Sequence, residues 1–293
     1  MRKLLLQLDS SRLPSVFDRV VAYDGGADEV MSYGGVAEAD VRDLVHGLIF
    51  TRGLKDLKNS AIFIGGADMS AGERLLAAAQ KSFFGPFRVS TMLDSNGSNT
   101  TAVAAVEKLA RALPGGVAGR RVLVTAGTGP VGTRAAGLLA KAGAVVTITS
   151  RKPDEGTRVA DAVHERFGGE VQAVTMHDAA EAKRVLDAAR PEVLLNCGPA
   201  GVMLVPRAAW AGRPELVAAA DLNAVPPLGV EGIEVNDDGA TREGATAFGA
   251  LGVGNFKMKL HKACIARLFE SNDAVLDAES ISDIARDLAR GRS

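Results

Sequence analysis

The chain has 293 residues, of which 47% are apolar and 24% are charged, and its net charge is −1. This composition excludes a disordered or fibrous chain, and the length suits two globular domains. Near-zero net charge predicts no broad surface for nucleic acid or an anionic membrane. No apolar run reaches the roughly 18 residues of a membrane span, and the two cysteines form no disulfide framework. We therefore expect a soluble, cytoplasmic protein.

The N-terminal third of the chain alternates short apolar runs with helical patterns. Strands are predicted at residues 4–8, 61–64 and 88–93. Ser70 and Glu73 form a capping-box pattern, which predicts that a helix over 70–83 begins at Ser70. The polar segment 94–99 then leads into an Ala-rich helix that ends near Ala112. Repeated strand–helix units of this kind indicate an α/β domain.

A Leu-Pro-Gly-Gly segment at 113–116 separates this part from a second series of strands. These strands are predicted at 121–125, 145–149, 171–174, 193–196 and 217–220. Their continuous apolar character is typical of a parallel sheet that is covered on both faces. The Gly-rich residues 248–254 predict a hinge or crossover loop. A long helix over 257–270 and another after Asp277 complete the chain.

The overall prediction is an α/β fold with two α/β domains and an interdomain cleft. Residues 1–118 and 255–293 form the first domain. Residues 119–254 form the second, which contains a Rossmann-like parallel sheet.

The clearest chemical motif follows the predicted strand 121–125 and opens a helical run. It matches GxGxxG and contains Gly127, Thr128, Gly129, Pro130, Val131 and Gly132. In this context glycines allow a tight turn and let the backbone approach a pyrophosphate, which the free N–H groups of the helix N-terminus can bind. The alternative is a Gly-rich turn in an ordinary strand–helix unit, which the complete strand–motif–helix–strand order makes the weaker interpretation.

The end of the next strand predicts which dinucleotide is bound. NAD sites usually carry Asp or Glu there, whereas this chain has Ser150, Arg151 and Lys152. A hydroxyl and two cations favour a 2′-phosphate through charge-assisted hydrogen bonds, so we predict NADP. The alternative is a solvated basic loop before Pro153.

The ends of two later strands also face the predicted ligand edge of the sheet. The candidate cofactor-binding residues there are Cys197, Gly198, Pro199, Ala200, Asn223 and Ala224. Cys197 is interpreted as a packing residue, because no histidine lies near it in sequence. No metal-ligand spacing is present, so we predict no metal site.

The first domain offers two polar clusters at predicted loops. The candidate substrate-binding residues are Tyr23, Gly25, Asp94, Asn96, Ser98, Asn99, Thr100 and Thr101. Helix capping accounts for one or two such residues, but seven polar residues of the eight in 94–101 favour binding. Lys257 is predicted near the start of a helix, where its positive charge opposes the helix dipole. This unfavourable position favours a functional role for Lys257. The alternative is an ordinary surface lysine that is exposed to solvent.

Together these segments resemble the NADP-dependent methylene-tetrahydromethanopterin dehydrogenases of one-carbon metabolism, over nearly the whole chain. The resemblance is carried by Ser15–Asp18, Tyr23–Asp28, Phe83–Ser90, Met92–Thr101, Ala126–Gly132, Asn223–Gly229 and Lys257–Ala266. The stretch DSNGSNTT at 94–101 is more diagnostic than the Gly-rich motif. The similarity is greatest to the branch that accepts both tetrahydromethanopterin and tetrahydrofolate forms.

The resemblance implies hydride transfer from the methylene group of the pterin to NADP, which gives the methenyl form. It implies a methylene-pterin substrate, with Lys257 and Asp24 as catalytic residues at the reacting ring. It also implies a homo-oligomer, either a trimer or a hexamer. Because the methenyl cation is stabilised by its own nitrogens, such chemistry needs no metal, nucleophile or strong base, only positioning.

Several alternatives remain open at this level. A methylene-tetrahydrofolate-specific dehydrogenase would share the cofactor site. A bifunctional dehydrogenase/cyclohydrolase carries Tyr-x-x-x-Lys, but here Ala27 and Ala37 follow Tyr23 and Tyr33 at that spacing. A shikimate-dehydrogenase-like enzyme shares the two-domain plan but has other substrate motifs. A non-catalytic NADP-binding sensor is the alternative outside the enzymes.

Overall fold

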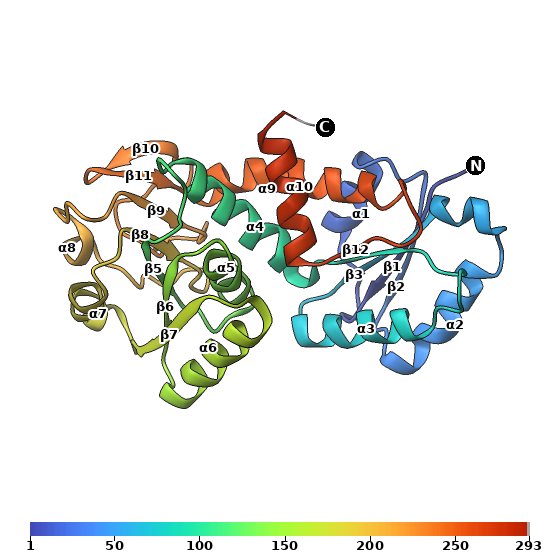
Figure 1. Ribbon diagram of the computed structural model, residues 1–293, viewed down its shortest axis with the longest axis horizontal. Helices are drawn as coiled ribbons and strands as arrows, with labels where there is room; N and C mark the ends of the chain where they lie inside the picture. The colour runs from blue at the N-terminus through green and yellow to red at the C-terminus, as the bar shows by residue number, and fades with distance from the viewer. Residues whose placement is uncertain (292–293) are drawn as a thin grey trace. The chain divides into compact units, whose positions relative to one another are not determined.

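The computed structural model describes residues 1–291 and shows an α/β fold with two sheets (Figure 1). Its elements are β1 (Leu4–Asp9), α1 (Val16–Asp24), β2 (Glu29–Gly34), α2 (Glu38–Ile49), η1 (Leu54–Asn59), β3 (Ser60–Gly65), α3 (Met69–Lys81), β4 (Ser90–Leu93), η2 (Ser95–Gly97), α4 (Ser98–Arg111), β5 (Arg121–Thr125), α5 (Pro130–Lys141), β6 (Val145–Ser150), α6 (Pro153–Phe167), β7 (Glu170–Thr175), η3 (Ala179–Glu181), α7 (Ala182–Ala189), β8 (Val193–Asn196), α8 (Arg207–Trp210), β9 (Ala218–Asp221), β10 (Asp238–Arg242), β11 (Ala245–Phe248), α9 (Ala250–Arg267), β12 (Val275–Leu276) and α10 (Ala278–Ala289). Within residues 1–291, no helix combines the length and the hydropathy needed to cross a bilayer.

The chain divides into two compact units. The first contains residues 1–100 and the chain from Met258 onward, and the second contains Thr101–Lys257. The predicted boundaries were 118/119 and 254/255. The observed boundaries instead fall inside α4 and α9, because each of these helices begins in one unit and ends in the other.

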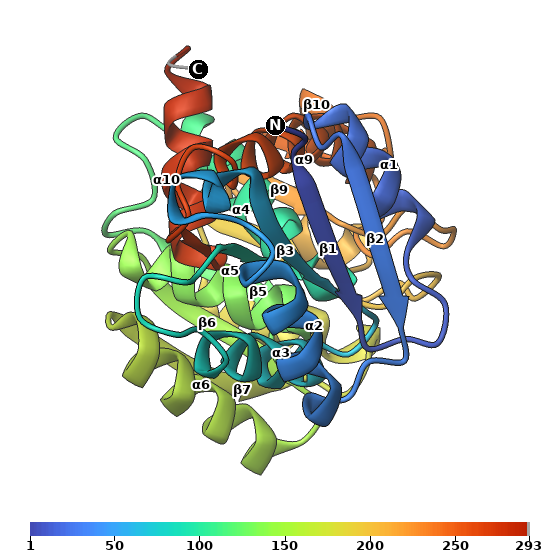
Figure 2. The ribbon, with the colours of Figure 1, turned by 90° about the vertical axis from the view of Figure 1, so that its right-hand side faces the viewer.

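The first sheet is parallel, with strand order β12-β4-β3-β1-β2. Figure 2 shows β2, β1 and β3 side by side. Leu6, Leu8, Ile62 and Ile64 pack with side chains of α2 and α3 in one buried cluster. Phe63 alternates to the other face, where its ring stacks on His261 of α9 at 5.6 Å. Strands β2 and β12 were not predicted, since β2 is an edge strand with partly exposed side chains and β12 has two residues.

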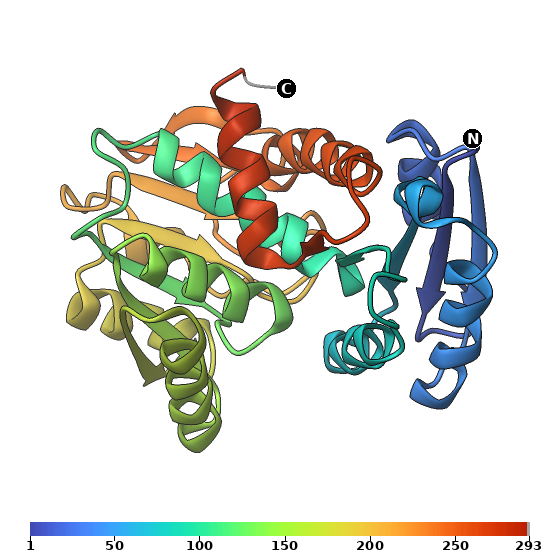
Figure 3. The ribbon, with the colours of Figure 1, turned by 45° about the vertical axis from the view of Figure 1, so that its right-hand side comes forward.

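The second sheet has the order β10-β11-β9-β8-β5-β6-β7, and only β10 runs antiparallel to its neighbour. Helices α5 and α6 pack against each other, as Figures 1 and 3 show. Helices α7 and α8 pack with Leu123, Leu194 and Ala219 in a cluster that includes the buried Trp210. The connections change direction between β5 and β8. This switch point is where doubly wound sheets bind ligands, and the predicted fold class is confirmed.

The capping box predicted at Ser70 is wrong. Helix α3 begins at Met69, and the side chain of Asp68 caps it by accepting hydrogen bonds from the backbone N–H groups of Ser70 and Ala71. Asp68 is as good a capping residue as Ser, and the capping residue therefore lies two positions earlier than predicted.

The Gly-rich hinge predicted over 248–254 is also wrong, because α9 already begins at Ala250. A Cβ atom at Gly249 would lie 2.0 Å from the carbonyl oxygen of Glu234, and one at Gly252 would lie 2.0 Å from that of Asp237. These glycines therefore let the start of α9 approach another backbone segment closely. Lys257 consequently lies within α9 and not near its start, so the dipole argument for a functional role does not hold.

Candidate dinucleotide site and pterin site

The Gly-rich turn after β5 has the geometry that a pyrophosphate site needs. A Cβ atom at Gly127 would lie 2.5 Å from Cβ of Ile148, and one at Gly132 would lie 2.7 Å from Cα of Gly127. These two glycines keep the turn close to β6 and the helix close to the turn. A Cβ atom at Gly129 would meet only the Ala126 carbonyl oxygen, at 3.5 Å, so this position faces open space. Gly129 caps α5, whose first-turn N–H groups have no partner within the helix.

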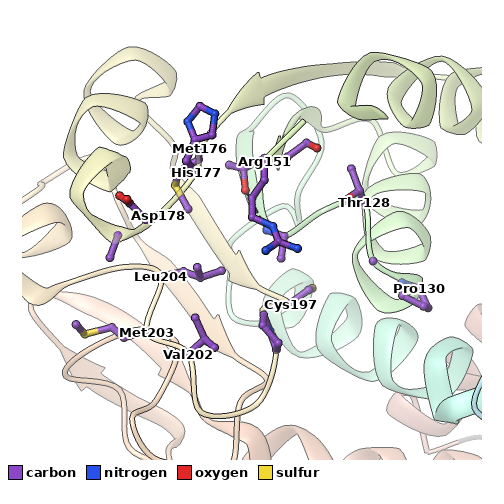
Figure 4. A pocket seen from close by; sticks show the side chains of 16 residues that line it. Thr128, Pro130, Arg151, Met176, His177, Asp178, Cys197, Val202, Met203 and Leu204 are labelled. Carbon is purple, nitrogen blue, oxygen red and sulfur yellow. Dashed lines mark hydrogen bonds between the residues drawn. The ribbon is translucent and has the colours of Figure 1, made fainter. Parts of the chain in front are cut away.

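A pocket of about 490 Å³ lies beside this turn, at the carboxyl ends of β5, β6, β7 and β8 (Figure 4). The predicted cofactor residues that line it are Thr128, Gly129, Pro130, Ser150, Arg151, Cys197 and Pro199. The other predicted residues, namely Gly127, Val131, Gly132, Lys152, Gly198, Ala200, Asn223 and Ala224, are not among those that line it. The pocket is also lined by Met176, His177 and Asp178, which follow β7 and were not predicted as site residues.

Arg151 is the cation that enters this pocket, and Figure 4 shows its side chain extending into the hollow. It also lines an adjoining shallow hollow with Lys152 and Arg158, where Asp154 and Glu155 contribute the opposite charge. Ser150 has a local role, because its hydroxyl donates to the carbonyl of Lys152 and accepts from that residue's N–H. Of the basic residues at the end of β6, Arg151 is therefore the one that lines the pocket, and Lys152 does not.

The carboxyl ends of β5, β8 and β9 are joined by buried hydrogen bonds that the sequence did not reveal. The hydroxyl of Thr125 donates to Oδ1 of Asn196 over 2.6 Å, and Nδ2 of Asn196 donates to Oδ1 of Asp221 over 2.7 Å. Asn223 continues this network, since its side chain accepts from the N–H of Val225 and donates to the carbonyl of Pro227. Asn223 therefore shapes the loop after β9, and only the polar strand ends signalled this in sequence.

Cys197 is not equipped to act as a nucleophile. Burial raises the pKa of its thiol well above the ordinary value, and the nearby Asp221 carboxylate raises it further. A thiol that stays protonated attacks poorly. Within residues 1–291, no three His, Cys, Asp or Glu side chains are grouped so as to hold a metal ion.

We predict that Cys197→Ala changes turnover by no more than about twofold, because the thiol packs and does not react. Steady-state rates of the variant and the unaltered protein, each with and without a chelator, would check this. Inactivation by the substitution, or loss of activity with chelator and recovery with zinc, would contradict it.

The polar side chains of the segment 94–101 are largely used in local hydrogen bonds. Asp94 accepts hydrogen bonds from the N–H and the hydroxyl of Thr100, and Asn99 donates to the carbonyl of Leu93 over 2.5 Å. Ser98 is also buried, and Thr101 lies in α4. Asn96 differs, because it is exposed and has a positive φ of 54°. Capping and turn formation thus explain more of this segment than predicted, and Asn96 is the member best placed to meet a ligand.

The structure does not bring Tyr23, Asp24 and Gly25 together with Asn96. These three residues end α1, and the following Asp28 donates its N–H to Lys3, which precedes β1. They therefore lie at the amino edge of the first sheet, and Asp24 forms a 2.8 Å ion pair with Lys262. Asn96 lies at the carboxyl edge, where its N–H donates to the carbonyl of Gly66 after β3.

Helix α9 crosses the same sheet in a direction that clarifies the position of Lys257. Ile265 contacts the amino edge, since a Cβ atom at Gly25 would lie 2.6 Å from its Cβ, and His261 stacks on Phe63 in β3. Lys257 lies one turn before His261 on the same side of the helix, in the direction of the carboxyl edge. The half-buried Lys257 also contrasts with the exposed Lys259.

Two carboxylates near the carboxyl edge were not predicted as site residues. A Cβ atom at Gly65 would lie 3.4 Å from Oδ2 of Asp9 and 3.6 Å from Oδ2 of Asp18. Asp9 is buried and accepts from the N–H groups of Ser11 and Ser15, so it orders the loop after β1. Asp18 lies in the first turn of α1. Asp18 belongs to the segment Ser15–Asp18 that carries the family resemblance, whereas no motif other than the strand end marks Asp9.

A doubly wound sheet with a Gly-rich turn, an open pocket and a basic strand end defines a two-domain dinucleotide-binding protein of the dehydrogenase type. The solved structure of quinate dehydrogenase from Corynebacterium glutamicum in complex with NAD has the same fold, with a TM-score of 0.56, 15% identity and 99% of each chain covered.

Proteins related in sequence define the family more narrowly than the fold does. Residues 16–96 match the family described as methylene-tetrahydromethanopterin dehydrogenase, N-terminal. The bifunctional protein MdtA of Methylorubrum extorquens is 50% identical over 289 residues, which is 98% of this chain and 99% of the relative. The NAD(P)-dependent methylenetetrahydromethanopterin dehydrogenase of the same bacterium is 32% identical over 298 residues, with 98% and 99% covered. This chain therefore belongs to the methylene-tetrahydromethanopterin dehydrogenase family, as its sequence motifs predicted.

Proposed function

We propose that this protein oxidises methylene-tetrahydromethanopterin to the methenyl form and transfers the hydride to NADP. The observation that carries the proposal is the Gly-rich turn with its pocket and Arg151, in a chain that is similar over its full length to dehydrogenases of this family. The relative that is named as a methylenetetrahydromethanopterin dehydrogenase is described as NAD(P)-dependent, which does not distinguish NADP from NAD. The preference for NADP is therefore a separate part of the proposal.

The residues present fit the dinucleotide. The open Gly129 position and the first turn of α5 would hold the pyrophosphate, and Arg151 would pair with the 2′-phosphate. Cys197 and Pro199 line the far side of the pocket, toward the half of the sheet that receives the nicotinamide in this fold. When bound, NADP supplies the hydride acceptor.

We place the pterin at the carboxyl edge of the first sheet. Asn96 is exposed there, Asp18 lies beside Gly65, and α9 directs Lys257 toward this edge. Amide and carboxylate groups match the amino and amide groups of a pterin ring. The proposed site omits Tyr23, Asp24 and Gly25, because the structure places them at the amino edge.

The chemistry asks little of the side chains beyond positioning. Loss of hydride from the methylene bridge leaves a cation that its two adjacent nitrogens stabilise, so no proton needs to be removed at the reacting carbon. The contribution of the chain is to orient the pterin, to hold it in near-attack geometry and to exclude water. Lys257 would hydrogen-bond the pterin as a fixed donor.

An assay of NADPH formation tests this function. Methylene-tetrahydromethanopterin and methylene-tetrahydrofolate are supplied separately, with NADP or NAD, and the absorbance of the reduced nicotinamide is followed. We expect reduction of NADP with the tetrahydromethanopterin form. Activity with the folate form alone would identify a folate-specific dehydrogenase. NADP binding without reduction by either pterin would favour a sensor.

We also propose that the protein is a homo-oligomer. Helix α1 exposes Val16, Phe17, Val20 and Tyr23, with between 41% and 74% of each residue's surface accessible. Contiguous exposed apolar side chains of this kind commonly mark an interface between chains. Light scattering on the purified protein would check the assembly. A monomer at micromolar concentration would contradict it.

A further inference from the structure

The buried carboxylate of Asp221 is the charged member of the network that joins β5, β8 and β9. It is 1% exposed and accepts three hydrogen bonds, from Nδ2 of Asn196 at 2.7 Å, from the N–H of Asn223 at 3.1 Å and from the N–H of Val230 at 3.0 Å. All three donors are neutral. The three N–H groups point at both carboxylate oxygens and act as fixed protein dipoles in place of water.

No cation among residues 1–291 forms an ion pair with Asp221, so its charge is not cancelled locally. The two loops that leave β8 and β9 are folded around it. A Cβ atom at Gly229 would lie 1.8 Å from Nδ2 of Asn196 and 2.7 Å from Oδ1 of Asp221, so this backbone closes directly over the network. The negative charge is therefore held at a fixed place with little water around it.

Asp221 lies close to the pocket. Asn196, which donates to Asp221 over 2.7 Å, directly precedes Cys197 in the chain, and Cys197 lines the pocket. In keeping with this proximity, the Asp221 carboxylate contributes to raising the pKa of the Cys197 thiol. In a doubly wound sheet, the half that contains β8 and β9 binds the nicotinamide mononucleotide part of the cofactor. That ring is cationic when oxidised and neutral when reduced, so a nearby buried charge acts on the two forms differently.

We propose that Asp221 is a positioning and electrostatic residue that selectively stabilises the oxidised, cationic nicotinamide in this site. The inference rests on the proposed function, since it assumes that NADP occupies the pocket. Asp221 need not touch the ring. It acts through its charge and through Asn196 and Asn223, which hold the flanking loops.

Binding of three ligands separates the charge effect from loop disorder. Dissociation constants of NADP⁺, NADPH and 2′-phospho-ADP-ribose, which lacks the nicotinamide, are measured by calorimetry for the unaltered protein and for Asp221→Asn. We expect the affinity for NADP⁺ to fall about fivefold or more relative to that for NADPH, as loss of one buried charge predicts. Binding of 2′-phospho-ADP-ribose should stay unchanged.

Matched variants control for altered packing. Thr125→Val removes the neutral hydrogen bond to Asn196 and should shift NADP⁺ and NADPH equally. Asp221→Glu disturbs the loops but keeps the charge, so it should retain the preference for NADP⁺. Where Asp221→Asn does not fold, Asp221→Ser provides a second uncharged variant, and thermal unfolding with 2′-phospho-ADP-ribose reports whether the fold is intact.

Equal losses of NADP⁺ and NADPH affinity in Asp221→Asn, or the same selective loss in Asp221→Glu, would overturn the inference. Failure of the unaltered protein to bind any of the three ligands would instead overturn the proposed function. The two failures are therefore distinguishable.

Discussion

Arg151→Ala should raise the KM for NADP by about 10- to 100-fold and leave the KM for NAD nearly unchanged. Arg151 is the cation that lines the pocket beside the Gly-rich turn, and NAD lacks the phosphate that it would bind. One charge-assisted hydrogen bond contributes about 1.5–3 kcal/mol, and each 1.4 kcal/mol corresponds to about tenfold in affinity. Initial rates at saturating methylene-pterin, with each cofactor varied, measure the effect.

Arg158→Ala is a suitable comparison for Arg151→Ala. Arg158 lines only the adjoining shallow hollow, which also contains Asp154 and Glu155, so we expect a smaller loss there. Equal increases in KM for NADP and NAD in Arg151→Ala would contradict the assignment, because they would show that Arg151 supports the fold or a part common to both cofactors.

Lys257→Ala should lower turnover, or affinity for the methylene-pterin, by about tenfold or more while NADP binding measured alone is retained. The reason is that Lys257 is half-buried and lies one turn before His261 on the helix that crosses the first sheet. Removal of one hydrogen-bonding partner from a buried polar contact costs roughly 1–3 kcal/mol. Steady-state kinetics with calorimetric titration of NADP checks both parts of the prediction.

Lys259→Ala is the matched control, since it removes an exposed lysine from the same helix. Asp24→Ala is a second control, because Asp24 pairs with Lys262 at the other edge of the sheet. We expect both variants to stay close to the unaltered rate. Unchanged kinetics in Lys257→Ala would remove this lysine from the proposed pterin site and leave the cofactor site unaffected.

Much of the fold follows from apolar runs and Gly-rich turns. The strands at 121–125 and 193–196 lie where predicted, because continuous burial on both faces leaves a strong apolar signal. Strand β2 was not predicted, because an edge strand that buries only one side chain leaves a weak apolar signal in the sequence. The glycines at 249 and 252 were misread as a hinge, since sequence does not distinguish a flexible glycine from one that allows two backbone segments to approach closely.

The candidate site, like the fold, was predicted only in part. The Gly-rich turn and the basic end of β6 are local in sequence, so their approximate roles were accessible without a structure. The Asn196–Asp221 pair depends on two strands that are adjacent only in the folded sheet. The polar cluster at 94–101 was predicted to bind substrate, but most of its side chains form hydrogen bonds with one another and with neighbouring backbone groups.

Isotope transfer tests the central claim most directly. Methylene-tetrahydromethanopterin that carries deuterium on its methylene carbon is oxidised in single turnovers with NADP, and the NADPH formed is analysed by mass spectrometry and NMR. Direct hydride transfer predicts one deuterium at carbon 4 of the nicotinamide, from the doubly labelled pterin, with no exchange into solvent. NADPH that lacks deuterium, or NADP that binds but is not reduced, would contradict the account.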